Sequence, residues 1–167
     1  MRLFHITDRN YQIGETVSIK DFEGDMCFYH ERHIDHQWIN DYLDTFRPEE
    51  FPLRRKCIYA FDKPGHCFFF LARKPSITDH CYEIEMDAKG GFPMVLTGRL
   101  IAHRNNEEIR RAMAEEYWHP TRDWNFYEYI GNEMTIISEV KFDASQCNIS
   151  RDRYMMDYDR ALYLYRY

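Results

Sequence analysis

Short runs of hydrophobic residues with the two-residue period of β-strands recur along the chain. The clearest run lies at residues 80–86, where Tyr82, Ile84 and Met86 alternate with Cys81 and two glutamates. Such alternation is typical of a strand that buries one face. On this pattern, strands are predicted at residues 3–7, 16–19, 57–61, 80–86, 124–129 and 134–140.

Two dipeptides indicate how these strands turn. Gly90 and Gly91 follow the strand at 80–86 and are expected to close it with a turn. Gly131 and Asn132 separate the last two predicted strands. Because two such residues are a usual connection of a β-hairpin, the strands at 124–129 and 134–140 are predicted to pair with each other.

One amphipathic helix stands out from the spacing of its apolar residues. It begins near Ile34, and Trp38, Tyr42 and Phe46 follow at intervals of four residues. That interval places these side chains on one face of a helix, which would be the face toward the core. Pro48 cannot continue the helix and is expected to end it.

Other helices are indicated by their ends. Asp62 can cap a helix that holds Pro64 in its first turn and continues to residue 74, and Asn105 or Asn106 can cap another that ends before Pro120. The tail at 152–167 fits either a Tyr-rich helix or a final edge strand. Several strands among three or four helices, with no repeat or linker, predict one α+β domain over residues 1–167. Residues 143–167 would be a C-terminal extension of unknown role.

Composition narrows the class of protein. A chain of 167 residues, 44% hydrophobic and 30% charged, can build one packed core. Its net charge of −6 argues against a sequence-independent grip on a nucleic-acid backbone. No apolar run approaches the roughly 18 residues of a membrane helix, and the N-terminus lacks the apolar segment of a signal peptide. We therefore expect a cytoplasmic protein, or one delivered into a target cell without a cleaved signal, and no membrane partner.

Several familiar sites are not supported by the sequence. The five cysteines form no Cys-x-x-Cys pair and are expected to be reduced. His30, His33 and His36 could line one helix stripe, but their spacing differs from that of the zinc-binding His-Glu-x-x-His helix, so no metal is predicted. The chain also has no nucleophile elbow, no Walker loop and no Gly-x-Gly-x-x-Gly motif. Any bound nucleotide would therefore lack a glycine-rich cradle.

Three separated segments remain as candidates for a functional site. The opening strand reads Phe4-His5-Ile6-Thr7 and is followed by Gly14. The basic run Arg54-Arg55-Lys56 leads into a strand with Tyr59, and a late strand carries Glu128 among aromatic residues. Taken singly, each has an ordinary structural explanation as a half-buried or packed strand residue. Their order along the chain is a more specific indication of function than any one segment.

This order resembles that of the ADP-ribosyltransferases of the His-Tyr-Glu type. It is similar to the small bacterial members related to the rifamycin-modifying transferases, and to a family of uncharacterised bacterial domains. The segments Tyr82-Glu-Ile-Glu85 and Glu115-Glu-Tyr-Trp118 also resemble family segments. The resemblance covers most of residues 1–142. It implies a split β-sheet core with peripheral helices, and NAD as the substrate.

The resemblance implies three catalytic residues. His5 would hydrogen-bond the adenosine ribose and fix the NAD, and Tyr59 would stack on the nicotinamide. Glu128 would hold the 2′-hydroxyl of the nicotinamide ribose and stabilise the positive charge that develops on that sugar.

Supporting contacts and departures also follow from the resemblance. Thr7 would support the NAD, Arg55 would meet its pyrophosphate, and Phe61 would replace Tyr59 if the register were shifted. Ile6 stands where many members have Gly. Phe126 stands where the arginine-directed members have a second Glu, which disfavours that subtype.

The implied activity is mono-ADP-ribosyl transfer from NAD to an acceptor, in a bacterial toxin, an injected effector or a phage-conflict protein. A protein acceptor is favoured over a nucleic acid or a small molecule, and an immunity or antitoxin protein would be a further partner. Two alternatives stay open. The chain could be a catalytically inactive relative that serves as a binding module, or it could be an NAD glycohydrolase.

Overall fold

The computed structural model describes residues 1–21, 34–72 and 80–166, and within them the chain is an α+β protein. Its strands are β1 (Arg2–Thr7), β2 (Thr16–Ser18), β3 (Ile58–Phe61), β4 (His80–Met86), β5 (Lys89–Pro93), β6 (Tyr127–Gly131) and β7 (Glu133–Glu139). Its helices are α1 (Ile34–Asp44), α2 (Pro64–Leu71), α3 (Val95–Ala102), α4 (Glu107–Trp118) and α5 (Ala144–Leu164), with short 3₁₀ turns η1 (Ile19–Asp21) and η2 (Arg54–Lys56). The α+β class and most of the predicted strands are thus confirmed.

The strands form one antiparallel sheet in the order β2-β7-β4-β1-β3-β6-β5. This sheet is nearly divided at its middle. β1 pairs with β4 along six residues, whereas β1 and β3 share the single register pair Phe4 and Phe61. The four strands on one side of this junction and the three on the other therefore behave as two half-sheets joined by one narrow contact.

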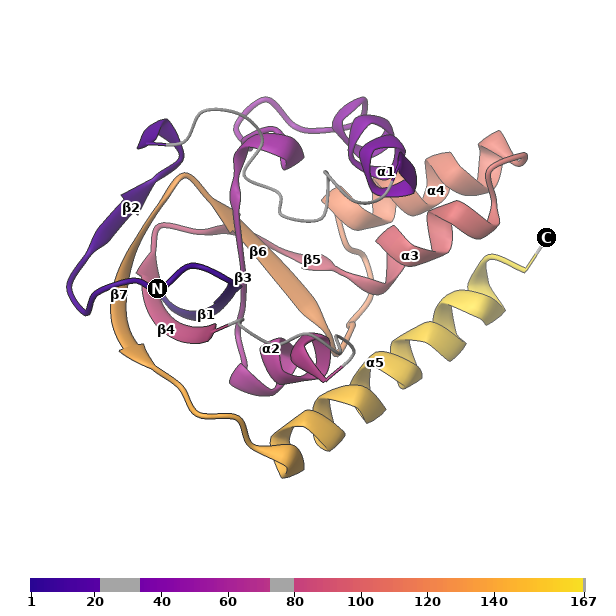
Figure 1. The fold of residues 1–167 in the computed structure, drawn as a ribbon. Coiled ribbons are helices and arrows are strands. Elements are labelled where there is room, and N and C mark those ends of the chain that lie inside the picture. The colour runs from indigo at the N-terminus through magenta and orange to yellow at the C-terminus, as the bar shows by residue number, and fades with distance from the viewer. Residues whose placement is uncertain (22–33, 73–79, 167) are drawn as a thin grey trace.

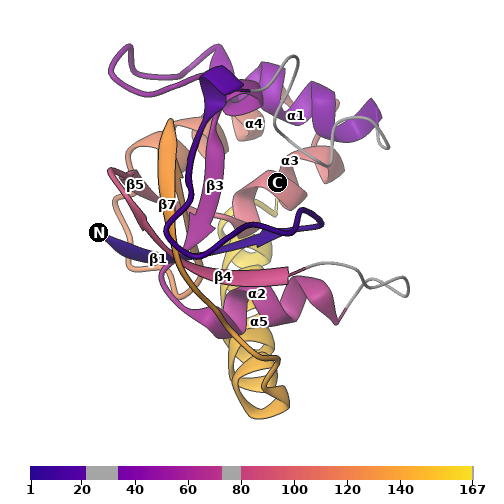
Figure 2. The ribbon, with the colours of Figure 1, turned by 60° about the vertical axis from the view of Figure 1, so that its left-hand side comes forward.

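The two faces of the sheet have different cores. The inner face holds a cluster that draws residues from both half-sheets, including Leu3 and Ile84 from one and Ile58 from the other. The outer face is covered by helices: α1, α3 and α4 gather over one end of it, and α2 and α5 cover the other (Figure 1). Both views show α5 running alongside α2 (Figure 1, Figure 2).

Local signals placed several helix ends correctly. Asn106 caps α4, because its side chain accepts a hydrogen bond from the Ile109 amide, and Glu107 and Glu108 occupy the first turn. The tail is a helix and not an edge strand, and the Asp143 carboxylate caps it by accepting from the amides of Ser145 and Gln146. The cap predicted at Asp62 is wrong, because α2 begins at Pro64 with Lys63 at the N-cap position.

The hairpin predicted at Gly131 and Asn132 is also wrong. β6 lies between β3 and β5, whereas β7 lies between β4 and β2, so the chain passes there from one half-sheet to the other. Gly131 is needed for close packing at this crossing, because a Cβ atom on it would lie 2.8 Å from the Met86 side chain.

The expected turn at Gly90 and Gly91 is in fact part of β5. Both glycines have positive φ angles, of 96° and 123°, and the register against β6 shifts between Gly90 and Phe92. The two glycines therefore allow an irregular strand where a turn was predicted. α3 was not predicted at all, since its eight residues are too few to show a clear helical period.

Candidate functional site

Glu128 lies in β6, and its buried side chain forms an ion pair with Arg54. Its Oε1 atom accepts one hydrogen bond from Arg54 Nη1 at 2.8 Å and another from the Tyr117 hydroxyl at 2.6 Å. The Arg54 and Glu128 side chains are only 6% and 4% exposed. Glu128, the candidate catalytic carboxylate, is thus held by one residue from η2 and one from α4.

Arg54 is bound on several sides. Its Nε donates to Asn40 Oδ1 at 2.7 Å, and its Nη1 also bonds the Tyr117 hydroxyl. The guanidinium carbon lies 5.1 Å from the ring centre of Tyr59 and 4.8 Å from that of Tyr117, which is cation–π geometry. These contacts hold a planar cation in one orientation, directed at the Glu128 carboxylate.

Two opposing effects act on the ionisation of Glu128. Burial raises the pKa of its carboxyl, because the charged form loses its hydration. The charge and hydrogen bond of Arg54 act in the opposite direction. Arg54 therefore favours the ionised form of Glu128, which burial disfavours.

Tyr59 joins this cluster through both its ring and its hydroxyl. The ring lies under the Arg54 guanidinium, and the hydroxyl donates to the Arg54 carbonyl at 2.6 Å. Tyr59 and Glu128 both lie on the helix-covered face of their half-sheet, since Phe61, two residues after Tyr59, is the register partner of Glu128. The structure therefore brings two of the three predicted catalytic residues together, with Arg54 between them.

His5 lies in the other half-sheet, and its side chain bonds the main chain of Tyr59. Its Nδ1 lies 2.7 Å from the carbonyl oxygen of Tyr59, and because a carbonyl only accepts, Nδ1 carries the hydrogen. The side chain belongs to the inner face of the sheet, with its register partner Tyr82. Burial lowers the pKa of His5, which favours the neutral ring. His5 thus bridges the junction of the half-sheets, and its side chain lies on the opposite face from that of Glu128.

The three supporting residues lie in three different elements, β1, η2 and β3. Thr7, near the end of β1, accepts a hydrogen bond from the Arg9 amide at 3.2 Å. Arg55 forms an ion pair with Asp41 of α1. Phe61 is buried, and its ring stacks on that of Phe70 with 5.5 Å between centroids. A ring that is already covered in this way is not available to stack on a ligand in place of Tyr59.

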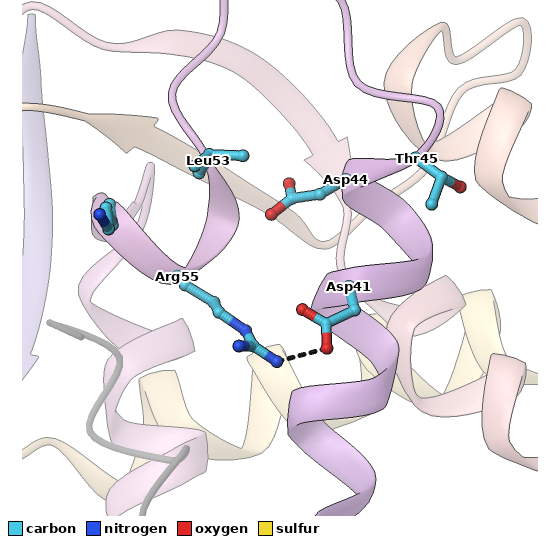
Figure 3. Close-up of a pocket in the computed structure, with 6 residues that line it drawn as sticks. Asp41, Asp44, Thr45, Leu53 and Arg55 are labelled. Carbon is cyan, nitrogen blue, oxygen red and sulfur yellow. Dashed lines mark hydrogen bonds and ion pairs between the residues drawn. The ribbon is translucent and has the colours of Figure 1, made fainter. Parts of the chain in front are cut away.

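A groove lies between α1 and η2, on the outer side of the cluster around Arg54. It has a volume of about 460 Å³ and is lined by Asp41, Asp44, Thr45, Leu53, Arg55 and Lys56. Figure 3 shows the Arg55–Asp41 ion pair crossing it. Asp44 connects the groove to the buried cluster, because its carboxylate oxygens accept from the Arg54 amide at 3.1 and 3.2 Å.

The structure also assembles a serine, a histidine and an aspartate that the sequence did not associate. His66 Nδ1 lies 2.9 Å from Ser150 Oγ, and His66 Nε2 lies 3.5 Å from Asp62 Oδ1. Ser150 is only 2% exposed and sits where α5 meets α2. At Gly65 the two helices are so close that a Cβ atom would lie 2.4 Å from the Gln146 carbonyl. Ser150 lies inside the contact between the two helices, so this group attaches α5 to α2.

The cluster around Glu128 includes residues that sequence reasoning missed. Arg54, Asn40 and Tyr117 come from three elements, and no motif relates them. The only signals were the basic run at 54–56 and the helix predicted to end before Pro120, which contains Tyr117.

The described residues offer neither a metal site nor a membrane-spanning helix. No three His, Cys, Asp or Glu side chains within residues 1–21, 34–72 and 80–166 could hold a metal ion. His30 and His33 lie outside the described residues, as does the side chain of His36. Among the helices described, none has the length and apolar character to cross a membrane. The chain matches no protein-family model and no curated protein.

Proposed function

We propose that this protein is a mono-ADP-ribosyltransferase that cleaves NAD at the bond between nicotinamide and ribose. The observation that carries the proposal is the contact series Tyr59–Arg54–Glu128 beside the junction of the two half-sheets. It joins an aromatic ring, a cation and a carboxylate, the groups that a reaction of NAD would use. The order of His5, Tyr59 and Glu128 along the chain, which resembles that of the His-Tyr-Glu transferases, gives further support.

The chemistry suits these residue types. When the glycosidic bond breaks, its electron pair leaves with nicotinamide, which departs neutral, and positive charge develops on the ribose. A carboxylate close to that carbon stabilises the transition state electrostatically. The acceptor then forms a bond to the same carbon and releases a proton to solvent. Glu128 would supply the charge, with Arg54 kept beside it, and Tyr59 would supply the surface for the nicotinamide. Arg55, on the same turn η2, would meet the pyrophosphate.

A second candidate function is favoured by a specific observation. The Arg54–Glu128 pair is buried and well hydrogen-bonded, which is also the form of an ion pair that only holds a fold together. In that case the chain would be an inactive relative that binds a partner without breaking a bond. A third reading, hydrolysis of NAD, would use the same residues with water as the acceptor.

The experiment is nicotinamide release from NAD by the purified protein, with and without a cell lysate, for the wild type and for Glu128→Gln. Glu116→Gln is the matched control, because Glu116 is a buried glutamate that accepts from Thr121 Oγ1 at 2.6 Å and from Trp124 Nε1 at 3.0 Å. It neighbours Tyr117 in α4 but bonds a different set of residues from Glu128. A transferase predicts release that rises with lysate and is lost in Glu128→Gln alone. Glu128-dependent release that lysate leaves unchanged indicates a hydrolase. No release under any condition supports the binding module.

A further inference from the structure

The outward side of α5 carries a row of exposed apolar side chains. Ile149, Met156 and Tyr163 are spaced seven residues apart and are 54%, 61% and 66% exposed. Seven residues make almost two helical turns, so the three side chains lie above one another along the helix. The buried side of α5, with Ser150, Asp157 and Ala161, lies about 100–160° around the helix from this row. Figure 1 shows α5 at the margin of the molecule.

Charged residues border the row with opposite sign on its two sides. Asp152 and Asp159 lie about 40–60° around the helix on one side, at 100° per residue, and Arg153 and Arg160 lie equally far on the other side. Each pair repeats at the same seven-residue interval as the apolar row. The face is therefore an apolar row with an acidic border and a basic border.

This pattern is complementary to itself in one orientation. If two copies of α5 pack through the row with their axes parallel, a two-fold axis along the helices places the acidic border of each copy against the basic border of the other. Like residues then meet in the row, Met156 against Met156 of the second copy. If the helices pack antiparallel, the two-fold axis places acidic border against acidic border and basic against basic, which is unfavourable.

We propose that this face of α5 is a homodimer interface in which the α5 helices of two copies lie parallel. Each heptad contributes a single apolar residue to it, so the buried area is small. Interfaces that bury less than roughly 1,200 Å² in total are typically weak and transient. The dimer consequently forms reversibly and with increasing protein concentration. This proposal is independent of the reaction proposed above.

The first test is sedimentation of the full chain over a hundredfold range of concentration, for the wild type and Met156→Glu. The wild type is expected to shift from monomer to dimer, and Met156→Glu to stay monomeric. Ile13→Glu is the matched control, because Ile13 is 64% exposed in a segment far from α5 in sequence, and it should leave the dimer unchanged. A wild type that is monomeric throughout, or an Ile13→Glu variant that loses the dimer equally, overturns the proposal.

The second test uses the charges. Asp152→Lys/Asp159→Lys has two basic borders and Arg153→Glu/Arg160→Glu has two acidic ones, so each is expected to be monomeric alone. Their equimolar mixture is expected to form a heterodimer. Arg160 also bonds the Asp123 carbonyl, so thermal melting must first show that the variants are folded. A mixture of folded variants that stays monomeric overturns the role of the charges.

The third test fixes the orientation. Ile149→Cys and Tyr163→Cys, each alone, are oxidised with diamide, which accepts the two electrons and two protons as two thiols form a disulfide. A parallel pair predicts that each variant crosslinks to itself. If only the mixture of the two variants crosslinks, the helices are antiparallel and the proposed arrangement is wrong.

Discussion

Arg54 Nη1 lies 2.8 Å from Glu128 Oε1, although 74 residues separate the two along the chain. Both side chains are nearly inaccessible to water, and the Tyr117 hydroxyl bonds both of them. Through this pair η2, α4 and β6 are held together. The pair therefore matters to the stability of the protein whether or not it also serves a reaction.

Removing one member of the pair should be costly. Arg54→Met leaves the Glu128 carboxylate buried without its counter-ion, and we expect a loss of about 3–5 kcal/mol in the free energy of unfolding. The double variant Arg54→Met/Glu128→Leu should be more stable than the sum of the two single losses indicates, because neither charge is left alone. Urea denaturation of the wild type, Arg54→Met, Glu128→Leu and the double variant measures this coupling. Additive single losses would show that the two residues do not stabilise each other.

Tyr59→Phe should separate the contribution of the Tyr59 hydroxyl from that of its ring. The substitution removes the hydrogen bond to the Arg54 carbonyl and retains the aromatic surface under the guanidinium. We expect a loss of about 1 kcal/mol in stability and little change in NAD affinity, since stacking needs only the ring. Calorimetric titration with NAD measures the affinity. A variant that binds NAD much more weakly than the wild type would contradict a stacking role.

Acidification should weaken the fold through His66. Burial lowers the pKa of His66 to about 3, from an ordinary value near 6.5. Because the unfolded chain takes up the proton first, the contribution of this residue to stability is full above pH 6.5 and falls as the pH drops toward 3. Linkage gives a loss of about 2 kcal/mol between pH 8 and pH 5 from this group.

The pH effect of His66 can be isolated with His66→Gln, which cannot titrate. Urea denaturation at pH 8 and pH 5 should show a smaller loss of stability in this variant than in the wild type, by that same amount. His5, whose pKa burial also lowers, is unchanged in the variant and contributes equally to both proteins. Equal losses in the two proteins would contradict the assignment to His66.

Two glycines in helices should respond in opposite ways to alanine. Gly65→Ala would place a Cβ atom 2.4 Å from the Gln146 carbonyl and 2.5 Å from Ser150 Oγ, which forces α2 and α5 apart. We expect the free energy of unfolding to fall by about 2 kcal/mol or more, as it does in overpacked cores. Gly98→Ala meets only the Tyr154 hydroxyl, at 3.6 Å, and should raise stability by about 1 kcal/mol. Thermal melting of both variants tests this contrast.

The sequence predicted those features of the fold that depend on residues close by along the chain. Alternation at residues 80–86 indicated a strand because one face of β4 is buried, and Asn106 indicated the start of α4 because a cap acts within one turn. Strand pairing depends on distant residues. Gly131 suggested a hairpin by its type, but its role is to let the chain pass close to Met86 as it crosses between the half-sheets.

The candidate site shows the same limit. Tyr59 and Glu128 could be singled out in advance, but not the residue that joins them. In the basic run at 54–56, Arg55 was expected to meet the ligand, whereas Arg54 is the residue that turns inward to Glu128 and Arg55 pairs with Asp41. A single turn of 3₁₀ helix has no repeat from which the inward position could be recognised.

The measurement that tests the central proposal most directly is the rate of nicotinamide release from NAD by the wild type, Glu128→Gln and Glu116→Gln, with a melting curve for each. We predict release by the wild type, a fall of about a hundredfold or more in Glu128→Gln, and little change in Glu116→Gln. Absence of release by the folded wild type, with or without lysate, would contradict the proposed reaction. So would equal losses in two variants that melt alike, because Glu128 would then act only as a part of the fold.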